Sequence, residues 1–181
     1  MDASTLIASL QDAVSGAQFE AAPSVDLQTT IYAPRDAVPD VLRALRDRPE
    51  LAFTLLAELT AVDFWPTEPR FELVYILVSP SRRARIRVKV RLNADDAHVA
   101  TATGVWPAAN WLEREVWDLF GIVFDGHPDP RRLLMPEDWD GYPLRKDYPV
   151  QIRKTPEYSE PLQVTAEQFR QNVERDRLTR R

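Results

Sequence analysis

The sequence predicts an α+β domain of two layers, in which helices pack on one face of a mixed sheet. Segments with a helical repeat of apolar residues and segments with alternating apolar residues follow one another in the order α-β-β-α-β-β, with room for one further strand. The clearest pair of alternating segments is apolar on one side only, which is typical of a sheet covered by helices on one face.

The length of the chain sets the expected number of domains. Its 181 residues, 44% hydrophobic and 28% charged, are enough for one well-filled domain. From about Pro149 onward, apolar residues become sparse and charges frequent. We therefore expect one α+β domain over residues 1–150, followed by an extended, proline-rich C-terminal tail over residues 151–181 that becomes ordered against a partner.

The first helix and the first two strands are predicted from the N-terminal residues. A helix is expected over residues 5–15, with Ser4 as its N-cap and Gly16 as its stop. Short strands are expected over residues 19–22 and 25–32, because apolar and polar residues alternate in the second of these segments.

A second helix is predicted to begin after Pro34. Its apolar residues recur at helical spacing and share one face: Val38, Val41, Leu42 and Leu45. Pro49 ends this helix, and residues 51–60 then have the pattern of a short helix or a turn.

A β-hairpin gives the strongest local signal. Apolar residues alternate over residues 71–77 and again over 86–92, on either side of Ser79-Pro80-Ser81. If the apolar sets face the core, charged residues of both strands lie on the opposite, wet face: Glu72, Arg85, Arg87, Lys89 and Arg91.

A third helix is predicted over residues 110–121, with both of its ends marked. Asn110 can cap the first turn, and Glu113 stands at the position of a capping box. Gly121 suits a left-handed exit, and the spacing of Arg114 and Asp118 allows them to pair. A short strand is expected at residues 122–124.

Residues 127–149, here called the strap, contain a proline every few residues. Such a spacing prevents a helix or a central strand, so this segment cannot satisfy its own backbone hydrogen bonds. It also carries many charges. We therefore expect an ordered segment that lies across another surface.

Composition excludes several kinds of site. With no cysteine and two histidines, the chain has no disulfides, thiolate zinc sites, ordinary iron–sulfur ligation or cysteine nucleophile. No apolar run approaches the roughly 20 residues of a membrane-spanning helix, and the N-terminus lacks the pattern of a secretory signal, so residence in the cytoplasm is expected.

Two motifs in the last third of the chain resemble those of a known family. Glu113-Arg114-Glu115, Asp118-Leu119-Phe120, His127, Arg131 and Leu133, at these spacings, resemble the signature of the C subunit of bacterial NADH–quinone oxidoreductase, the thirty-kilodalton subunit family of complex I. The run Gly141-Tyr142-Pro143-Leu144-Arg145-Lys146-Asp147-Tyr148-Pro149 resembles the second hallmark of this family. Pro130 and Tyr142 depart from it, since the family has leucine and histidine there.

The resemblance implies a cofactor-free structural subunit of the peripheral arm of a proton-translocating enzyme, which passes electrons from NADH through FMN and iron–sulfur clusters to quinone. FMN and the clusters would belong to partner subunits, and the nearest partners would carry the quinone pocket and the terminal cluster. The chain would lie on the cytoplasmic side of the bacterial inner membrane, peripherally and without a membrane span.

The charged residues of both motifs alternate in sign, which suits an interface that sets the register between subunits. We expect the following residues to contact partner subunits: Glu113, Arg114, Glu115, Asp118, His127, Arg131, Arg132, Arg145, Lys146 and Asp147. No catalytic, cofactor-binding or metal-ligating residue is expected in this chain.

Three other interpretations stay open. A homologous subunit of a membrane-bound hydrogenase, or of a complex fed by ferredoxin or a deazaflavin, would carry the same motifs. A stand-alone metalloenzyme could use the carboxylates of residues 113–118 with His127, although carboxylates at i and i+2 point apart on a helix. The basic residues of 82–91 are a pattern of nucleic-acid binding, but the net charge of −5 opposes it and no nucleic-acid partner is expected.

Overall fold

The computed structural model describes residues 2–149, 165, 167–171 and 174, and the chain divides into two units, residues 1–148 and 149–181. The first unit contains the following elements: α1 (Ala3–Ala13), β1 (Glu20–Ala21), β2 (Thr29–Tyr32), the 3-10 helix η1 (Arg35–Ala37), α2 (Val38–Asp47), β3 (Leu55–Asp63), β4 (Phe71–Ser79), β5 (Ala84–Leu92), β6 (His98–Ala100), α3 (Ala109–Phe120) and β7 (Val123–Asp125).

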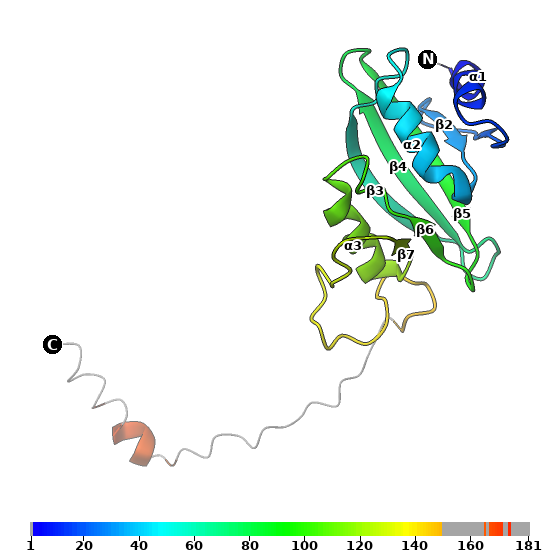
Figure 1. Ribbon diagram of the computed structural model, residues 1–181. Helices are drawn as coiled ribbons and strands as arrows, with labels where there is room; N and C mark the ends of the chain where they lie inside the picture. Colours follow the sequence, from blue (N-terminus) through cyan, green and yellow to red (C-terminus); the bar gives the residue numbers. More distant parts are fainter. Residues whose placement is uncertain (1, 150–164, 166, 172–173, 175–181) are drawn as a thin grey trace. The chain divides into compact units, whose positions relative to one another are not determined.

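A five-stranded mixed sheet organises this unit, in the order β1-β2-β5-β4-β3 (Figure 1). β3, β4 and β5 are antiparallel, whereas β2 runs parallel to β5. The predicted hairpin is confirmed as β4 and β5, in which Tyr75 lies opposite Val88. β6 and β7 form a separate parallel pair, of which only β7 was foreseen, shifted by one residue.

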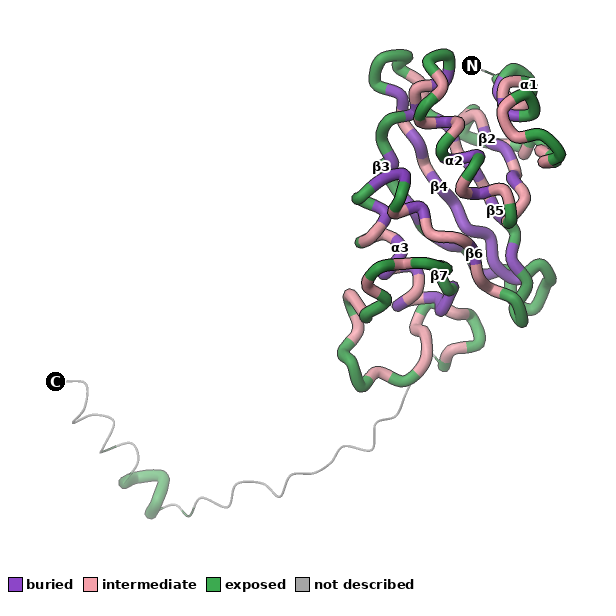
Figure 2. The backbone as a smooth tube through the Cα atoms, viewed as in Figure 1, coloured by how far each residue is buried: buried purple, intermediate pink, exposed green. Residues whose placement is uncertain are grey.

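The helices form the second layer. α2 and α3 lie on the same face of the sheet, and α1 packs beside α2 (Figure 1). The predicted face of α2 is fully buried, and the core side of the hairpin is buried along its whole length (Figure 2). The predicted α+β, two-layer class is therefore confirmed.

Three local predictions for residues 1–63 were wrong. α1 begins at Ala3, because the Asp2 side chain, and not Ser4, accepts a hydrogen bond from the N–H of Thr5. The second strand begins only at Thr29, because Leu27 adopts a left-handed conformation (φ 59°) that interrupts an extended chain. Residues 55–63 form strand β3, where a helix or turn was expected for part of them.

The error at β3 has a physical cause. Its leucines, alanines and glutamate are good helix formers, so local preference favoured a helix. In the structure, pairing with β4 over eight positions overrides that preference, with a bulge between Leu56 and Glu58. The partner strand lies outside the window on which a local prediction depends.

The second unit is described only at residues 149, 165, 167–171 and 174. Residues 167–171 are helical, and Thr165 and Gln168 exchange hydrogen bonds of 3.1 and 3.3 Å between side chain and backbone N–H, a capping box. The rest of the predicted tail lies outside the described residues.

Candidate partner interface: a strap held by buried charges

Helix α3 is the platform on which the strap is built. It ends at Gly121, which has φ +73° as predicted for a left-handed cap. Its N-terminus differs from the prediction: Ala108 is the N-cap, with no side-chain hydrogen bond, and Glu113 does not form a capping box with Asn110. Glu113 instead points into the domain.

The carboxyl group of Glu113 is fully buried. Thr101 donates a hydrogen bond to it through its hydroxyl, and Ala102 through its backbone N–H, each at 2.5 Å. Burial raises the pKa of Glu113 to about 7, against the opposing effect of these two hydrogen bonds. No cation within residues 2–149 is in hydrogen-bond contact with this carboxyl, so it ionises only near neutral pH.

His127 lies next to this carboxyl, with Nε2 3.8 Å from an oxygen of Glu113. The backbone N–H of Asp129 donates to Nδ1 of His127 at 3.0 Å, so in the neutral ring the proton belongs on Nε2, which donates to the carbonyl of Asn110 at 3.1 Å. The imidazole thus ties the start of the strap to the start of α3.

Arg114 and Asp118 do not pair with each other, contrary to the prediction. Arg114 binds backbone carbonyl groups of the strap, and Asp118 binds backbone N–H groups. Arg114 donates to the carbonyls of Arg131 and Arg132, both at 3.0 Å. One oxygen of Asp118 accepts the next three N–H groups of the strap: Leu133 at 3.0 Å, Leu134 at 2.7 Å and Met135 at 2.8 Å.

The second oxygen of Asp118 accepts a hydrogen bond from Arg132 at 2.7 Å. Burial alone would raise the pKa of this carboxyl, but the hydrogen bonds from the strap backbone and Arg132 outweigh it and lower the pKa. Arg132 also donates to the carbonyls of Trp139 and Gly141 at 2.9 and 3.3 Å, so it closes the loop of the strap.

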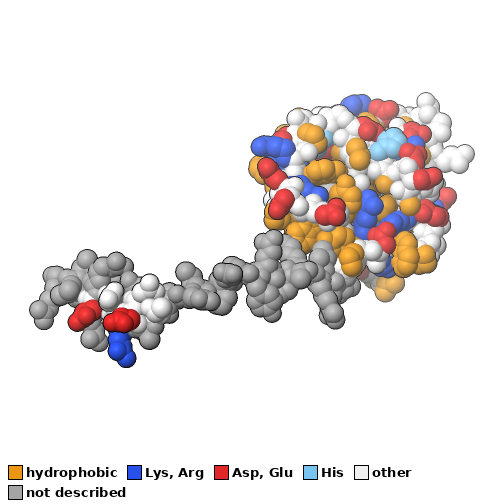
Figure 3. Space-filling view, turned by 90° about the horizontal axis from the view of Figure 1, so that it is seen from below, with side chains coloured by type: hydrophobic (Ala, Val, Ile, Leu, Met, Phe, Trp, Pro, Cys, Tyr) orange, Lys and Arg blue, Asp and Glu red, His pale blue; other side chains and the backbone are white. Residues whose placement is uncertain are grey.

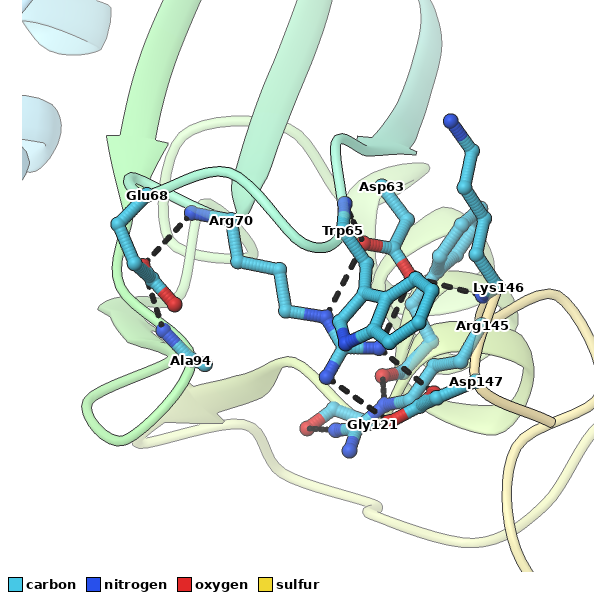
Figure 4. A network of polar contacts seen from close by, with 10 residues as sticks. Asp63, Trp65, Glu68, Arg70, Ala94, Gly121, Arg145, Lys146 and Asp147 are labelled. Atoms are coloured by element: carbon cyan, nitrogen blue, oxygen red, sulfur yellow. Dashed lines mark hydrogen bonds and ion pairs between the residues drawn. The ribbon is translucent and has the colours of Figure 1, made fainter.

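The end of the strap is bound by a second network, around Arg70 (Figure 4). The guanidinium of Arg70 pairs with Asp63 through two contacts of 3.0 Å and with Asp147 at 2.6 and 3.0 Å. Asp63 also accepts from the N–H of Lys146 at 2.8 Å. Burial opposes ionisation of Asp63, yet its hydrogen bonds from Arg70 and from backbone N–H groups lower its pKa to about 2.

Arg145 completes the attachment at the C-terminus of α3. It donates to the carbonyls of Phe120 and Gly121, and its guanidinium lies 4.5 Å from the ring centre of Tyr142. A cation at this end of a helix interacts favourably with the free carbonyl groups. A Cβ at Gly121 would lie 2.5 Å from atoms of both Arg145 and Tyr142, so only glycine allows this packing.

The structure brings the predicted residues together, but it buries four of the ten. Glu113 and Asp118 are fully buried, Arg114 nearly so, and the His127 side chain is 4% exposed. Glu115, Arg132 and Arg145 are half-buried, and the more exposed residues of the predicted set are Arg131, Lys146 and Asp147. Contact of these residues with a partner stays a prediction.

Sequence reasoning missed two groups of residues. Asp63, Arg70 and Thr101 bind the strap and α3 from outside both motifs, and nothing local marks them. Large apolar side chains near the strap remain exposed: Phe64, Trp65, Trp111, Leu134 and Leu144, each by 44–60%. Seen from below, hydrophobic side chains lie among charged ones on the domain surface (Figure 3).

The cavity beside Glu113, Trp117 and His127 is small. Its volume of about 40 Å³ is below the roughly 300–1,000 Å³ of ligand pockets. No group of three or more His, Cys, Asp or Glu among the described residues could hold a metal ion. No helix in this part of the chain is both long and apolar enough to cross a membrane.

A family model described as the 30 Kd subunit of respiratory-chain NADH dehydrogenase matches residues 31–154, a span that includes β3, β4, β5, α3 and the strap. The chain belongs to this family. The C subunit of NADH–quinone oxidoreductase from Roseiflexus sp. (strain RS-1), a relative, is 49% identical over 146 residues, which cover 80% of each chain.

A further relative and a solved structure are similar to this chain in other contexts. The C/D subunit of NADH–quinone oxidoreductase from Methylococcus capsulatus (strain ATCC 33009 / NCIMB 11132 / Bath) is 39% identical over 169 residues, which cover 90% of this chain and 29% of that protein. A chain of the membrane-bound sulfane sulfur reductase, an archaeal respiratory membrane complex, superposes with a TM-score of 0.66 at 29% identity, covering 81% of this chain and 85% of that one.

Proposed function

We propose that this chain is a cofactor-free structural subunit of a proton-translocating NADH–quinone oxidoreductase, peripheral on the cytoplasmic side of the membrane, where it braces the subunits that carry the quinone pocket and the terminal iron–sulfur cluster. Membership of the 30 Kd subunit family supports the enzyme. The observation that supports a bracing role is the strap: Arg114, Asp118 and Arg70 bind its backbone and side chains within the chain.

The charged side chains of the motifs mainly bind the strap to the rest of the same chain. A long segment rich in proline has many unpaired backbone groups, and buried guanidinium and carboxylate groups satisfy them without secondary structure. Rigid attachment fixes the exposed side chains of the strap, Leu134 and Leu144, before any partner arrives. A preorganised surface loses less entropy on binding, which is what a component that positions its neighbours requires.

The partner is proposed to include the D part of the enzyme, the portion that is joined to the C part in relatives named C/D. The protein of Methylococcus capsulatus is one of these relatives, and its C and D parts share one chain. Covalent fusion is compatible only with an arrangement in which the two parts lie within reach of each other. Electron carriers would then be supplied by partners, since the chain has no cysteine.

Charge insertion on the strap tests this function. Leu134→Asp and Leu144→Asp should lower the amount of assembled complex on native gels, because each places a charge in an apolar contact. Turnover per assembled complex should stay near normal. Ala8→Asp is the control: Ala8 is an exposed apolar residue of α1, away from the strap.

Glu115→Ala adds a charged probe, because Glu115 has no hydrogen-bond or ion-pair partner among the residues that the structure describes. It should reduce assembly and leave the free protein folded. Full assembly with turnover abolished, in any of these variants, would contradict a bracing role and indicate a direct role in the reaction.

A related complex is the second candidate. The likeness to a chain of the sulfane sulfur reductase complex supports it. Affinity purification of the tagged full chain from solubilised membranes, followed by identification of the co-purifying chains, distinguishes the two. FMN-binding and NADH-binding subunits should co-purify only in the first case.

A further inference from the structure

The face of the sheet that points away from α2 and α3 is covered by no helix among the described residues of this unit (Figure 1). Leu55, Val78 and Arg85 form one row of side chains across β3, β4 and β5 on this face. Leu55 and Val62 are 48% and 39% exposed, and Ile76 and Val78 are half-buried. The strands β3 and β4 therefore present exposed aliphatic side chains to the outside, with the carboxylate of Glu58 among them.

Basic residues border this aliphatic surface along β5. Those further along the strand each reach a carboxylate of the same chain: Arg87 with Asp26 at 2.7 Å, Lys89 with Glu72 at 2.7 Å and Arg91 with Glu20 at 3.1 Å. At the hairpin end of β5 the arginines have no such carboxylate among the described residues. Within residues 2–149, Arg83 and Arg85 have no carboxylate partner, and Arg82 donates only to the carbonyl of Pro49.

Uncompensated arginines beside exposed aliphatic side chains are unexpected on a chain of net charge −5. Like charges in close succession repel one another, and this repulsion is relieved when an opposite charge binds. We propose that the aliphatic surface of β3 and β4, together with Arg83 and Arg85, docks an acidic, partly apolar surface of another protein of the assembly. This interface lies on the opposite side of the sheet from α3 and is separate from the strap.

Other occupants fit the charges less well. Residues 150–181 of this chain contain seven Lys and Arg against five Asp and Glu, so this tail is itself basic. A second copy would present the same face in a symmetric pair, and on this face Arg83 and Arg85 outnumber Glu58, the carboxylate without an ion-pair partner within residues 2–149. Single-stranded nucleic acid is bound largely by stacking on aromatic side chains, whereas the ring of Tyr32 on this face is already covered by Arg91 at 3.6 Å.

The occupant can be captured through a charge-preserving substitution. Arg85→Lys keeps the positive charge and introduces an amine that a carbodiimide couples directly to a carboxylate in contact. The tagged full chain carrying this substitution is treated with carbodiimide in solubilised membranes, and mass spectrometry identifies the linked peptide. A link from position 85 to an Asp or Glu of another protein is expected. A link to residues 150–181, a link to a second copy, or no link at all would overturn the proposal.

A charge reversal measures how much the two arginines contribute to binding. Arg83→Glu combined with Arg85→Glu should lower recovery of the linked partner about tenfold at moderate salt, because opposed like charges disfavour the complex. Arg43→Glu, on the exposed side of α2, is the matched control and should have no effect. An unchanged urea midpoint for the purified full chain shows that the fold is retained. Unchanged recovery, or recovery of RNA in place of a protein, would overturn the proposal.

The proposal rests on the proposed function only in taking the partner from the same assembly. If strap variants block assembly while the charge reversal does not, the second interface fails and the proposed function stands. If the linked partner is not a component of the oxidoreductase, the interface stands and the proposed function fails.

Discussion

Removal of the Asp118 carboxylate is the most direct perturbation of the strap. This group is fully buried and accepts hydrogen bonds from Arg132 and from the backbone N–H groups of residues 133–135, at 2.7–3.0 Å. Asp118→Ala leaves three N–H groups without their acceptor. It also leaves Arg132, whose side chain is 16% exposed, as a cation without its carboxylate.

The magnitude follows from this geometry. Breaking a buried ion pair by removal of one partner typically costs about 3–5 kcal/mol, because the remaining charge is left uncompensated. Total stabilities of domains are about 5–15 kcal/mol, so Asp118→Ala should remove a large fraction of the free energy of unfolding. With a urea m-value of about 1–3 kcal/mol per molar, the unfolding midpoint should fall by about 1 M or more.

Urea denaturation of the purified full chain, followed by tryptophan fluorescence, measures this loss. Glu115→Ala is the matched control, since Glu115 is a half-buried carboxylate on the same helix without an ion-pair partner among the described residues. It should change stability by less than about 0.5 kcal/mol. A cost below about 1 kcal/mol for Asp118→Ala, or equal costs for both variants, would refute the view that buried charges hold the strap.

Three further predictions concern burial and backbone conformation. Because burial raises the pKa of Glu113 from 4.5 to about 7, the folded chain holds this proton more tightly than the unfolded chain. The free energy of unfolding should therefore fall by up to about 3 kcal/mol as pH rises from about 4.5 to 7. Urea midpoints measured against pH should show this fall, and Glu113→Gln should abolish it. Gly121→Ala should lower the free energy of unfolding by about 1–3 kcal/mol, since φ is +73° and the added Cβ meets Tyr142. Proteolysis of the strap should become faster, and an unchanged rate would contradict this packing. Val88→Asp should unfold the domain, as its side chain is 1% exposed, whereas Arg87→Asp should leave circular dichroism nearly unchanged; equal sensitivity at both positions would mean that both faces of β5 are buried.

Several parts of the fold could be predicted from the sequence because short-range physics decides them. The buried face of α2, the hairpin of β4 and β5, and the left-handed exit at Gly121 each depend on residues only a few positions apart. Strand β3 could not be predicted in this way. Its identity depends on pairing with β4, and its own residues favour a helix.

The site shows the same division. Motif spacing indicated the strap and the family, and the absence of cysteine excludes thiolate ligands for a metal or cluster. Only the tertiary structure decided what the charges contact. Asp118 lies at helical spacing from Arg114, yet its partners are backbone N–H groups 15–17 residues away. Every residue type except proline carries such a group, so no sequence pattern marks it as the partner, and only the path of the folded strap brings it to the carboxylate.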